Sequence, residues 1–288
     1  MTVSERVIVI GAGPVGLCLS LSLAQAGVQV ILIEALGEDN FLEQVPRAGT
    51  NHPATLELLD RIGLYPRLES RGIIAPLFHY WDRREHKLIA EFDHVHLKDD
   101  TPFPYVLQCE RIKIVEEALK LAKAHPGIDL HLATTFTSCT QDADGVTAWM
   151  ANPAGEIESM RGAYLVSCEG ARSNARAELG IEFEGFTYPD RTLSIEVAYD
   201  FETTAIPSAT TFPIPMNGQI CSTGKDRRTA GVFISRPGRR RTRRRSRAKR
   251  RCRRDCSLFC RRENRSRSSE AIFMWSTNAW RKNSGWGA

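Results

Sequence analysis

The sequence lacks the features that mark secreted and membrane-spanning chains. No apolar run approaches the ~18 residues that a membrane helix needs, and the start, MTVSER, shows no basic segment followed by an apolar core. The eight cysteines have no even spacing, so they do not indicate a disulfide framework. We therefore expect a reduced, cytoplasmic protein with no membrane partner.

Patterns typical of metal sites are also scarce. Two groups of residues attract attention: Cys252, Cys256 and Cys260, and His79, His94 and His96. The cysteines have no second pair at the usual distance and lie among arginines that would repel a cation. The histidines have no carboxylate or cysteine partner at ligand spacing, so we interpret them as strand residues that face solvent or substrate. The sequence predicts no metal site.

Charge is unevenly distributed along the chain. Residues 236–288 contain 19 Lys and Arg against 3 Asp and Glu, whereas residues 1–235 contain 20 against 31. The first part therefore has the composition of an ordinary acidic globular protein, and the second that of a basic tail. A chain of 288 residues is long enough for one large domain or two modest ones.

The beginning of the chain carries the pattern of a dinucleotide-binding βαβ unit. A β-branched strand is expected at 6–10, a helix over 14–26, and a second strand that ends at Glu34. The glycines between the first strand and the helix, in GxGxxG spacing, are Gly11, Gly13 and Gly16. In this pattern the first glycine permits the tight turn, the second lets amides approach a pyrophosphate, and the third lets the helix pack closely. Glu34 would accept hydrogen bonds from a ribose. The motif alone does not distinguish FAD from NAD.

Two further motifs stand just before helices. The Pro46-Arg47 turn precedes an expected helix over 53–62, and Gln108 precedes an expected helix from about 110 to 124. Taken alone, Arg47 could equally be a surface arginine near a turn.

A third motif, CEGARSNAR, joins an expected buried strand to an expected helix from about 173 to 179. Glu169 and Gly170 lie where the strand ends and the helix begins. A phosphate or a ribose can be held at such a place, because the first amides of a helix point outward.

These motifs, in this order, resemble the N-terminal part of the FAD-dependent aromatic hydroxylases. These are single-component flavoprotein monooxygenases of the phenol and 3-(3-hydroxyphenyl)propionate hydroxylase kind, and the match covers about residues 5–200. The resemblance implies bound FAD, NADH or NADPH as co-substrate, and hydroxylation of an aromatic, phenolic molecule by O2 through a flavin hydroperoxide. It also implies that the glycine motif, Glu34, Arg47, Gln108 and the Glu169-Gly170 pair contact the cofactor. It identifies no catalytic residue.

The resemblance also assigns the fold class and the domains. We expect an α/β protein, with a GxGxxG Rossmann-like FAD-binding domain and an incomplete β-sheet substrate domain. The FAD-binding domain comprises residues 1–75 and 105–184, and fragments of the substrate domain comprise residues 76–104 and 185–205. Strands are expected in both fragments, and a pair of them within residues 185–201.

The family pattern is no longer recognisable after about Phe201, and no Gly-Asp, the family's third flavin motif, occurs beyond it. Read in another frame, the codons from Phe273 to Ala288 permit YVVNKRVAEKLRVGR, which resembles the family segment ahead of that motif. We therefore hypothesise a frame slip between about Phe201 and Pro215. On this hypothesis, residues 206–288 are an out-of-frame, largely disordered basic tail, and the 288-residue chain is an impaired enzyme.

Two other functions fit parts of the sequence. An NAD(P)-binding dehydrogenase would use the same opening, but no catalytic Tyr-Lys, Cys or His arrangement is visible, and a bound yellow cofactor would exclude it. A basic nucleic-acid-binding protein would use residues 236–251 to neutralise phosphates. That run has no interleaved aromatic residues for base stacking and begins in the middle of a domain. We therefore expect no specific nucleic-acid partner, and the oligomeric state is not indicated.

Overall fold

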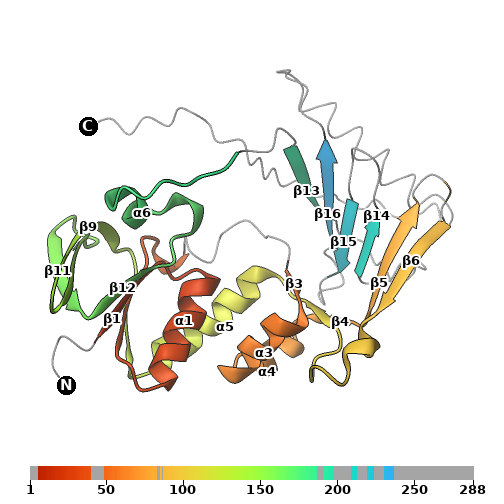
Figure 1. Ribbon diagram of the computed structural model, residues 1–288, viewed down its shortest axis with the longest axis horizontal. Helices are drawn as coiled ribbons and strands as arrows, with labels where there is room; N and C mark the ends of the chain where they lie inside the picture. The colour runs from red at the N-terminus through yellow and green to blue at the C-terminus, as the bar shows by residue number, and fades with distance from the viewer. Residues whose placement is uncertain are drawn as a thin grey trace.

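The computed structural model of the chain combines a layered α/β part with a separate, mainly antiparallel sheet (Figure 1). The residues that it describes are 6–39, 49–82, 85, 87–186, 191–197, 209–212, 219–223 and 230–236. Among the described helices, none combines the length and the apolar character that crossing a membrane requires.

A four-stranded parallel sheet, in the order β12-β1-β2-β8, lies at the centre of the α/β part. Its strands are β1 (Val7–Ile10), β2 (Val30–Ile33), β8 (Ile128–His131) and β12 (Tyr164–Ser167). β1 and β2 are almost wholly buried, as their continuous apolar runs predict. The expectation that β12 would be buried is wrong: among the described strands it pairs with β1 alone, and its residues are exposed or half-buried.

Two helices cover one face of this sheet. They are α1 (Pro14–Gln25) and α5 (Arg111–Ala124), which lie side by side in Figure 1 and match the helices expected after the glycine motif and after Gln108. Leu17 and Leu21 of α1 join Val9 and Leu32 of the sheet in the main hydrophobic core. Gly27 follows α1 with φ +85°, a conformation that favours glycine and ends the helix.

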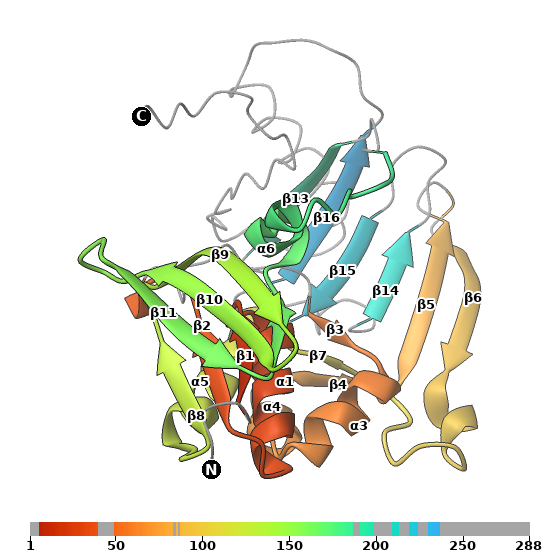
Figure 2. The same ribbon diagram turned by 60° about the vertical axis from the view of Figure 1, so that its left-hand side comes forward.

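An antiparallel sheet covers the opposite face, as Figure 2 shows. It consists of β9 (Thr135–Asp142), β10 (Gly145–Ala151) and β11 (Ile157–Gly162). Phe136 and Met150 from this sheet pack against Ile8 and Ile33. Alternate residues of β1 and β2 thus enter two different cores, which explains why these strands have no polar face.

A small sheet and two helices follow in the chain between β2 and α5. The helices are α3 (Pro53–Arg61) and α4 (Tyr65–Glu69), and the sheet has the order β3 (Thr50–Asn51), β7 (Val106–Gln108), β4 (Ile73–Ala75). The expected helix over 53–62 is α3, and Gly63, with φ +71°, lies just beyond its end. β7 lies between the other two strands and leads directly into α5.

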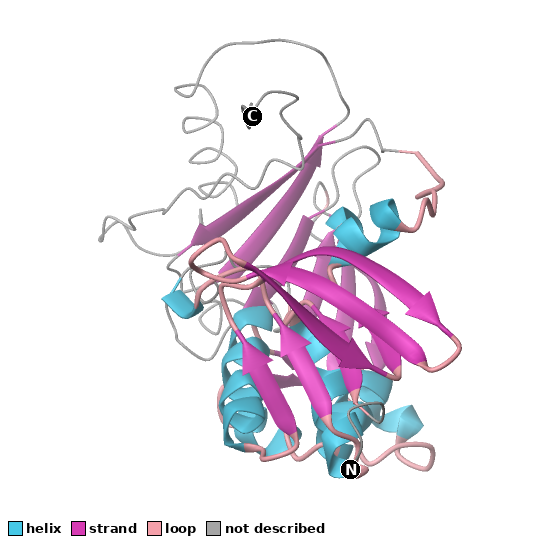
Figure 3. Cartoon of the chain, turned by 90° about the vertical axis from the view of Figure 1, so that its left-hand side faces the viewer, coloured by secondary structure: helices cyan, strands magenta, loops and turns pink. Residues whose placement is uncertain are grey.

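The second part is a six-stranded sheet, drawn among the magenta strands of Figure 3. Its order is β13 (Arg191–Val197), β16 (Ala230–Arg236), β15 (Gln219–Thr223), β14 (Ala209–Phe212), β5 (Leu77–Asp82), β6 (Lys87–Asp93). Only the β14–β5 contact is parallel. The strands expected within 76–104 are β5 and β6, but the chain then turns into a short 3-10 helix, η2 (His94–Leu97).

The C-terminal strands differ from the sequence-based expectation. Three of them, β14, β15 and β16, lie within residues 206–288, which we expected to be a largely disordered tail. Their sequences, ATTF, QICST and AGVFISR, are short runs with β-branched and aromatic residues, which favour strands. Within residues 185–201 the structure describes one strand, β13, instead of the expected pair. The arginine run after Arg236 lies outside the described residues.

Candidate functional site

The glycine turn lies at the carboxyl end of β1 and leads into α1. Gly11 has φ +96°, and a Cβ atom there would lie 2.8 Å from the backbone oxygen of Cys168. A Cβ atom on Gly16 would lie 1.8 Å from the backbone oxygen of Gly11. Both positions therefore require glycine, because the turn, the helix and the end of β12 approach each other through backbone atoms.

Gly13 is a glycine for a different reason. It is the N-cap of α1, its backbone is extended (φ −61°, ψ 177°), and a Cβ atom there would meet nothing within 4 Å. The space beside it is thus open, and the first amides of α1 point into the region ahead of the helix. These residues fit the pyrophosphate of a dinucleotide, which is bound by such amides and by the helix dipole.

Glu34 connects the end of β2 with the glycine turn. One carboxylate oxygen, Oε2, accepts a hydrogen bond from the Ala12 amide at 2.8 Å, and Oε1 accepts one from the Leu36 amide at 2.9 Å. The side chain is buried, and each carboxylate oxygen has a second lone pair. Glu34 therefore holds the turn in place, and its remaining lone pairs are acceptors of the kind that hydroxyl groups of a ligand require.

Glu169 has its carboxylate surrounded by donors of its own strand–helix connection. These donors are the hydroxyl groups of Ser167 and Ser173 at 2.8 and 2.7 Å, and the amides of Asn174 and Ala175 at 2.9 and 3.1 Å. The last three belong to the start of α6 (Asn174–Glu178), the helix expected after this motif. The Glu169 carboxylate thus satisfies the first amides of the helix that follows it.

Glu169 and Gly170 nevertheless lie next to the glycine turn. The residue before them, Cys168, donates its amide hydrogen to the Ile10 oxygen at 2.7 Å, which aligns the ends of β12 and β1. Gly170 begins a short 3-10 helix, η3 (Gly170–Arg172), with φ +75°, and a Cβ atom there would meet nothing within 4 Å. The structure therefore brings the glycine motif, Glu34, Glu169 and Gly170 together at the carboxyl edge of β12-β1-β2, where open α/β sheets bind ligands.

Gln108 is not on this edge but at the end of β7. It is buried, and its side-chain oxygen accepts a hydrogen bond from the Thr50 hydroxyl at 2.9 Å. Arg47, which the resemblance also implies to contact the cofactor, lies outside the described residues.

Asn51 is a residue that the sequence analysis missed. Its side-chain amide donates to the backbone oxygens of Gly49 and Leu107, at 3.2 and 3.1 Å, and so fixes β3 to β7. Its one local signal is its place in GTNHP, just ahead of a helix, which is typical of any turn.

The described cysteines do not form a nucleophilic site. Burial raises the pKa of the Cys18 and Cys109 thiols to about 11, and it also raises the pKa of Cys168. These thiols are therefore protonated at neutral pH and are poor nucleophiles. Cys18 and Cys168 are half-buried rather than fully buried.

Two of the histidines singled out in the sequence, His79 and His94, have local partners. His79 Nε2 lies 2.7 Å from Glu91 Oε2 across the β5–β6 pair. His94 Nδ1 forms a hydrogen bond with the Pro76 oxygen at 2.8 Å. His94 and His96 lie in η2 and not in a strand, contrary to the prediction, because the chain turns at Asp93, whose carboxylate caps that helix. In the described part of the chain, no three metal-ligating side chains gather.

Comparisons with known proteins agree with this geometry. A family model described as an FAD binding domain matches residues 4–282, and so extends beyond about residue 200, where the sequence pattern ceased to be recognisable. Para-nitrophenol 4-monooxygenase from Pseudomonas sp. (strain WBC-3) is 31% identical over 201 residues, which are 70% of this chain and 49% of that protein. The 3-(3-hydroxy-phenyl)propionate/3-hydroxycinnamic acid hydroxylase from Mycobacterium sp. (strain JLS) is 29% identical, over 67% of this chain and 33% of that protein.

Solved structures show the same likeness. The p-nitrophenol 4-monooxygenase PnpA from Pseudomonas putida DLL-E4 superposes with a TM-score of 0.78 at 28% identity, covering 88% of this chain and 62% of that one. The flavin-dependent monooxygenase PieE, solved with FAD and substrate, has a TM-score of 0.73 at 18% identity, over 86% of this chain and 46% of that one, a likeness in fold. The chain thus spans a third to a half of the two curated relatives named above.

Proposed function

Because the chain belongs to the FAD binding domain family, we propose that it is the FAD-binding part of an NAD(P)H-dependent monooxygenase that hydroxylates an aromatic, phenolic molecule. In this reaction one oxygen atom of O2 enters an aromatic C–H bond as a hydroxyl group. The other leaves as water, and NAD(P)H supplies the two electrons. FAD, when bound, supplies the redox chemistry that activates O2.

The open position at Gly13 carries the dinucleotide-binding part of this proposal, and the family match supports FAD as that dinucleotide. The turn is closed by backbone contacts at Gly11 and Gly16 and open only at the glycine that the pyrophosphate would approach. In the proposed complex the first amides of α1 bind the pyrophosphate, and Glu34 accepts hydrogen bonds from the ribose next to the adenine. Glu169 keeps the strand–helix connection in shape beside them, and Gly170 leaves room for the cofactor.

The substrate class rests on the relatives. Para-nitrophenol 4-monooxygenase and the 3-(3-hydroxy-phenyl)propionate hydroxylase carry phenolic substrates in their names. We propose the same class here, with O2 and NADH or NADPH as co-substrates, and activity in the cytoplasm, where NAD(P)H is available. The substrate domain is proposed to be incomplete in this chain. Any reduced cofactor would then be open to water, and electrons would be lost to hydrogen peroxide.

The test is an aerobic assay of the purified 288-residue chain. The chain is incubated with FAD, passed over a desalting column, and mixed with NADH or NADPH and with 3-(3-hydroxyphenyl)propionate. Oxidation of NAD(P)H, formation of hydrogen peroxide and formation of hydroxylated product are then measured, with free FAD at equal concentration as the blank. We expect retained yellow flavin, slow NAD(P)H oxidation, and peroxide in excess of product.

Two results would contradict the proposal in different ways. A chain that binds NAD(P)+ but no flavin would instead be an NAD(P)-binding protein of the dehydrogenase kind. A chain that converts a phenol with one product formed for each NAD(P)H oxidised would have a complete substrate site.

A further inference from the structure

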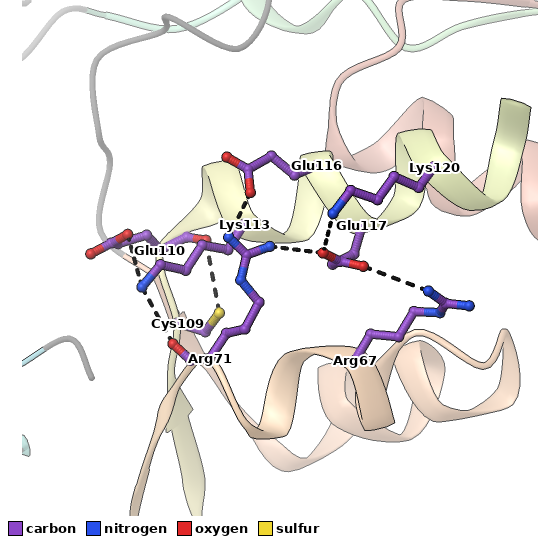
Figure 4. Close-up of polar contacts among 8 residues, drawn as sticks. All are labelled: Arg67, Arg71, Cys109, Glu110, Lys113, Glu116, Glu117 and Lys120. Atoms are coloured by element: carbon purple, nitrogen blue, oxygen red, sulfur yellow. Dashed lines mark hydrogen bonds and ion pairs between the residues drawn. The ribbon is translucent and has the colours of Figure 1, made fainter. Parts of the chain in front are cut away.

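A group of charged residues joins α4 and the turn after it to α5 (Figure 4). At its centre, the Arg71 guanidinium donates from Nη1 to Glu117 Oε1 at 2.9 Å and from Nη2 to Glu116 Oε2 at 2.6 Å. The Glu117 side chain is 11% exposed and the Arg71 side chain 30%. Such forked, charge-assisted hydrogen bonds fix the direction of the arginine more strictly than a single contact does.

The backbone of Arg71 is also bound to α5. Its carbonyl oxygen accepts a hydrogen bond from Lys113 Nζ at 3.3 Å, and this lysine lies 3.2 Å from Glu110 Oε2. Lys113 is itself buried, in the first turn of α5. Both ends of Arg71, the side chain and the carbonyl, are therefore held by the same helix.

The chain leads from Arg71 directly to the strand beside Gln108. Gly72 follows, and a Cβ atom there would lie 3.0 Å from the backbone oxygen of Gln108. Ile73 then begins β4 and pairs with Gln108. The contacts of Arg71 with α5 therefore lie two residues ahead of Ile73, the first residue of β4. On the other side of β7, Thr50 and Asn51 form hydrogen bonds with Gln108 and Leu107.

Two other cations share the carboxylate of Glu117 without this connection. Lys120 Nζ lies 2.8 Å from Oε1, and Arg67 Nη1 lies 3.7 Å from Oε2. The side chain of Arg67 is 48% exposed, and the residue lies within α4, away from β4. Arg67 is therefore a matched control for Arg71: it has the same charge and a shared partner, but no direct backbone path to β7.

We propose that Arg71 is a positioning residue for Gln108, holding β4 against β7 so that the Gln108 side chain meets the flavin half of the cofactor. This inference rests on the proposed function and on the family resemblance, which implies that Gln108 contacts the cofactor; we place that contact on the flavin half. The ADP half is bound elsewhere, at the carboxyl edge of β12-β1-β2. Loss of Arg71 should therefore affect the two halves of FAD unequally.

The test compares Arg71→Met with Arg67→Met in the 288-residue chain. Dissociation constants are measured for FAD and, separately, for ADP, and thermal unfolding shows which variants are folded. We expect Arg71→Met to weaken FAD binding on the order of tenfold, because neighbouring groups couple at this scale, and to leave ADP binding unchanged. Arg67→Met should leave both unchanged. An equal loss for FAD and ADP, or no loss for FAD, would overturn the inference.

Two additions keep the test decisive. Arg71→Lys retains the charge but not the fork, so it should show a smaller loss in FAD affinity and replaces Arg71→Met if that variant does not fold. Hydrogen exchange in β7, measured without any ligand, should be faster in the Arg71 variant than in the Arg67 variant. If the parent chain binds no FAD, the proposed function fails, and exchange in β7 alone decides the positioning role; equal exchange in both variants would refute it.

Discussion

Gly13→Ala and Gly16→Ala, made separately in the glycine turn, should distinguish an effect on cofactor binding from an effect on stability. At Gly13 the backbone is extended and nothing lies within 4 Å of the new methyl group. The stability cost is then only that of a poorer N-cap, a few tenths to about 1 kcal/mol. At Gly16 the methyl group would lie 1.8 Å from the Gly11 oxygen, and backbone atoms cannot move aside as a side chain can. Overpacking of this kind costs about 1–3 kcal/mol or more.

For Gly13→Ala we expect the loss in FAD affinity to be larger than the loss in stability. A methyl group on residue 13 occupies the space through which a pyrophosphate would reach the amides of α1. Losing one hydrogen bond to a charged group costs about 1.5–3 kcal/mol, which weakens FAD binding roughly ten- to hundredfold. Gly13→Ala should therefore bind FAD poorly while it unfolds near the temperature of the parent chain.

Thermal unfolding and FAD titration of the same preparations provide the assay. For a domain of this size, each kcal/mol lowers the unfolding midpoint by about 2–4 °C, so Gly16→Ala should unfold measurably earlier than Gly13→Ala. Gly127→Ala is the control, because Gly127 precedes β8 at the opposite edge of the sheet and its nearest neighbour is a ring atom of His125 at 3.2 Å. If Gly13→Ala binds FAD as the parent does, the pyrophosphate does not lie at this turn.

Four further outcomes follow from the same account. Glu34→Gln places an amide donor against a backbone donor, so FAD affinity and the unfolding midpoint should both fall; an unchanged titration would contradict the ribose role. Burial raises the pKa of Cys18 to about 11, so peptide mapping after iodoacetamide treatment at pH 8 should find it unmodified until the chain unfolds. Chiefly through the hydrogen bond from Lys120, the pKa of Glu117 is lowered. The ionised Glu117 carboxylate should therefore stabilise the folded chain above its unfolded pKa of about 4.3, and this contribution should be lost as pH falls through the lower folded pKa. Unfolding midpoints measured between pH 6 and 3 should then decline more steeply in the parent than in Glu117→Gln. Sequencing of the gene should show, after a slip near codons 201–215, another open frame with a Gly-Asp codon pair beyond codon 288; immediate stop codons would refute the slip.

The βαβ unit could be predicted because its signals are local. Four consecutive apolar residues, a glycine turn and a helix with Gly27 at its end specify β1, α1 and β2 within about thirty residues. The same holds for α3 and α5, whose ends follow from Gly63 and from the helical pattern that begins after Gln108. The position of Glu34 also follows from its distance along the chain.

Long-range contacts could not be predicted in this way. The bond from Asn51 to the Leu107 oxygen spans 56 residues and the one from Arg71 to Glu116 spans 45, and neither leaves a pattern in the nearby sequence. The exposure of β12 depends on its place at the sheet edge, which only the pairing order decides. The strands at 209–212 and 219–223 have only 4 and 5 residues, which is too short for an alternating apolar pattern to predict a strand.

A comparison of FAD with FMN tests the central claim most directly. In the proposed complex the ADP half of FAD is held by the amides at the start of α1 and by Glu34, and FMN lacks the AMP part of that half. Equilibrium titration of the purified 288-residue chain, followed by flavin fluorescence, should therefore give saturable binding of FAD, competition by ADP, and much weaker binding of FMN. Equal affinity for FMN and FAD, or no saturable binding of FAD at all, would contradict the account.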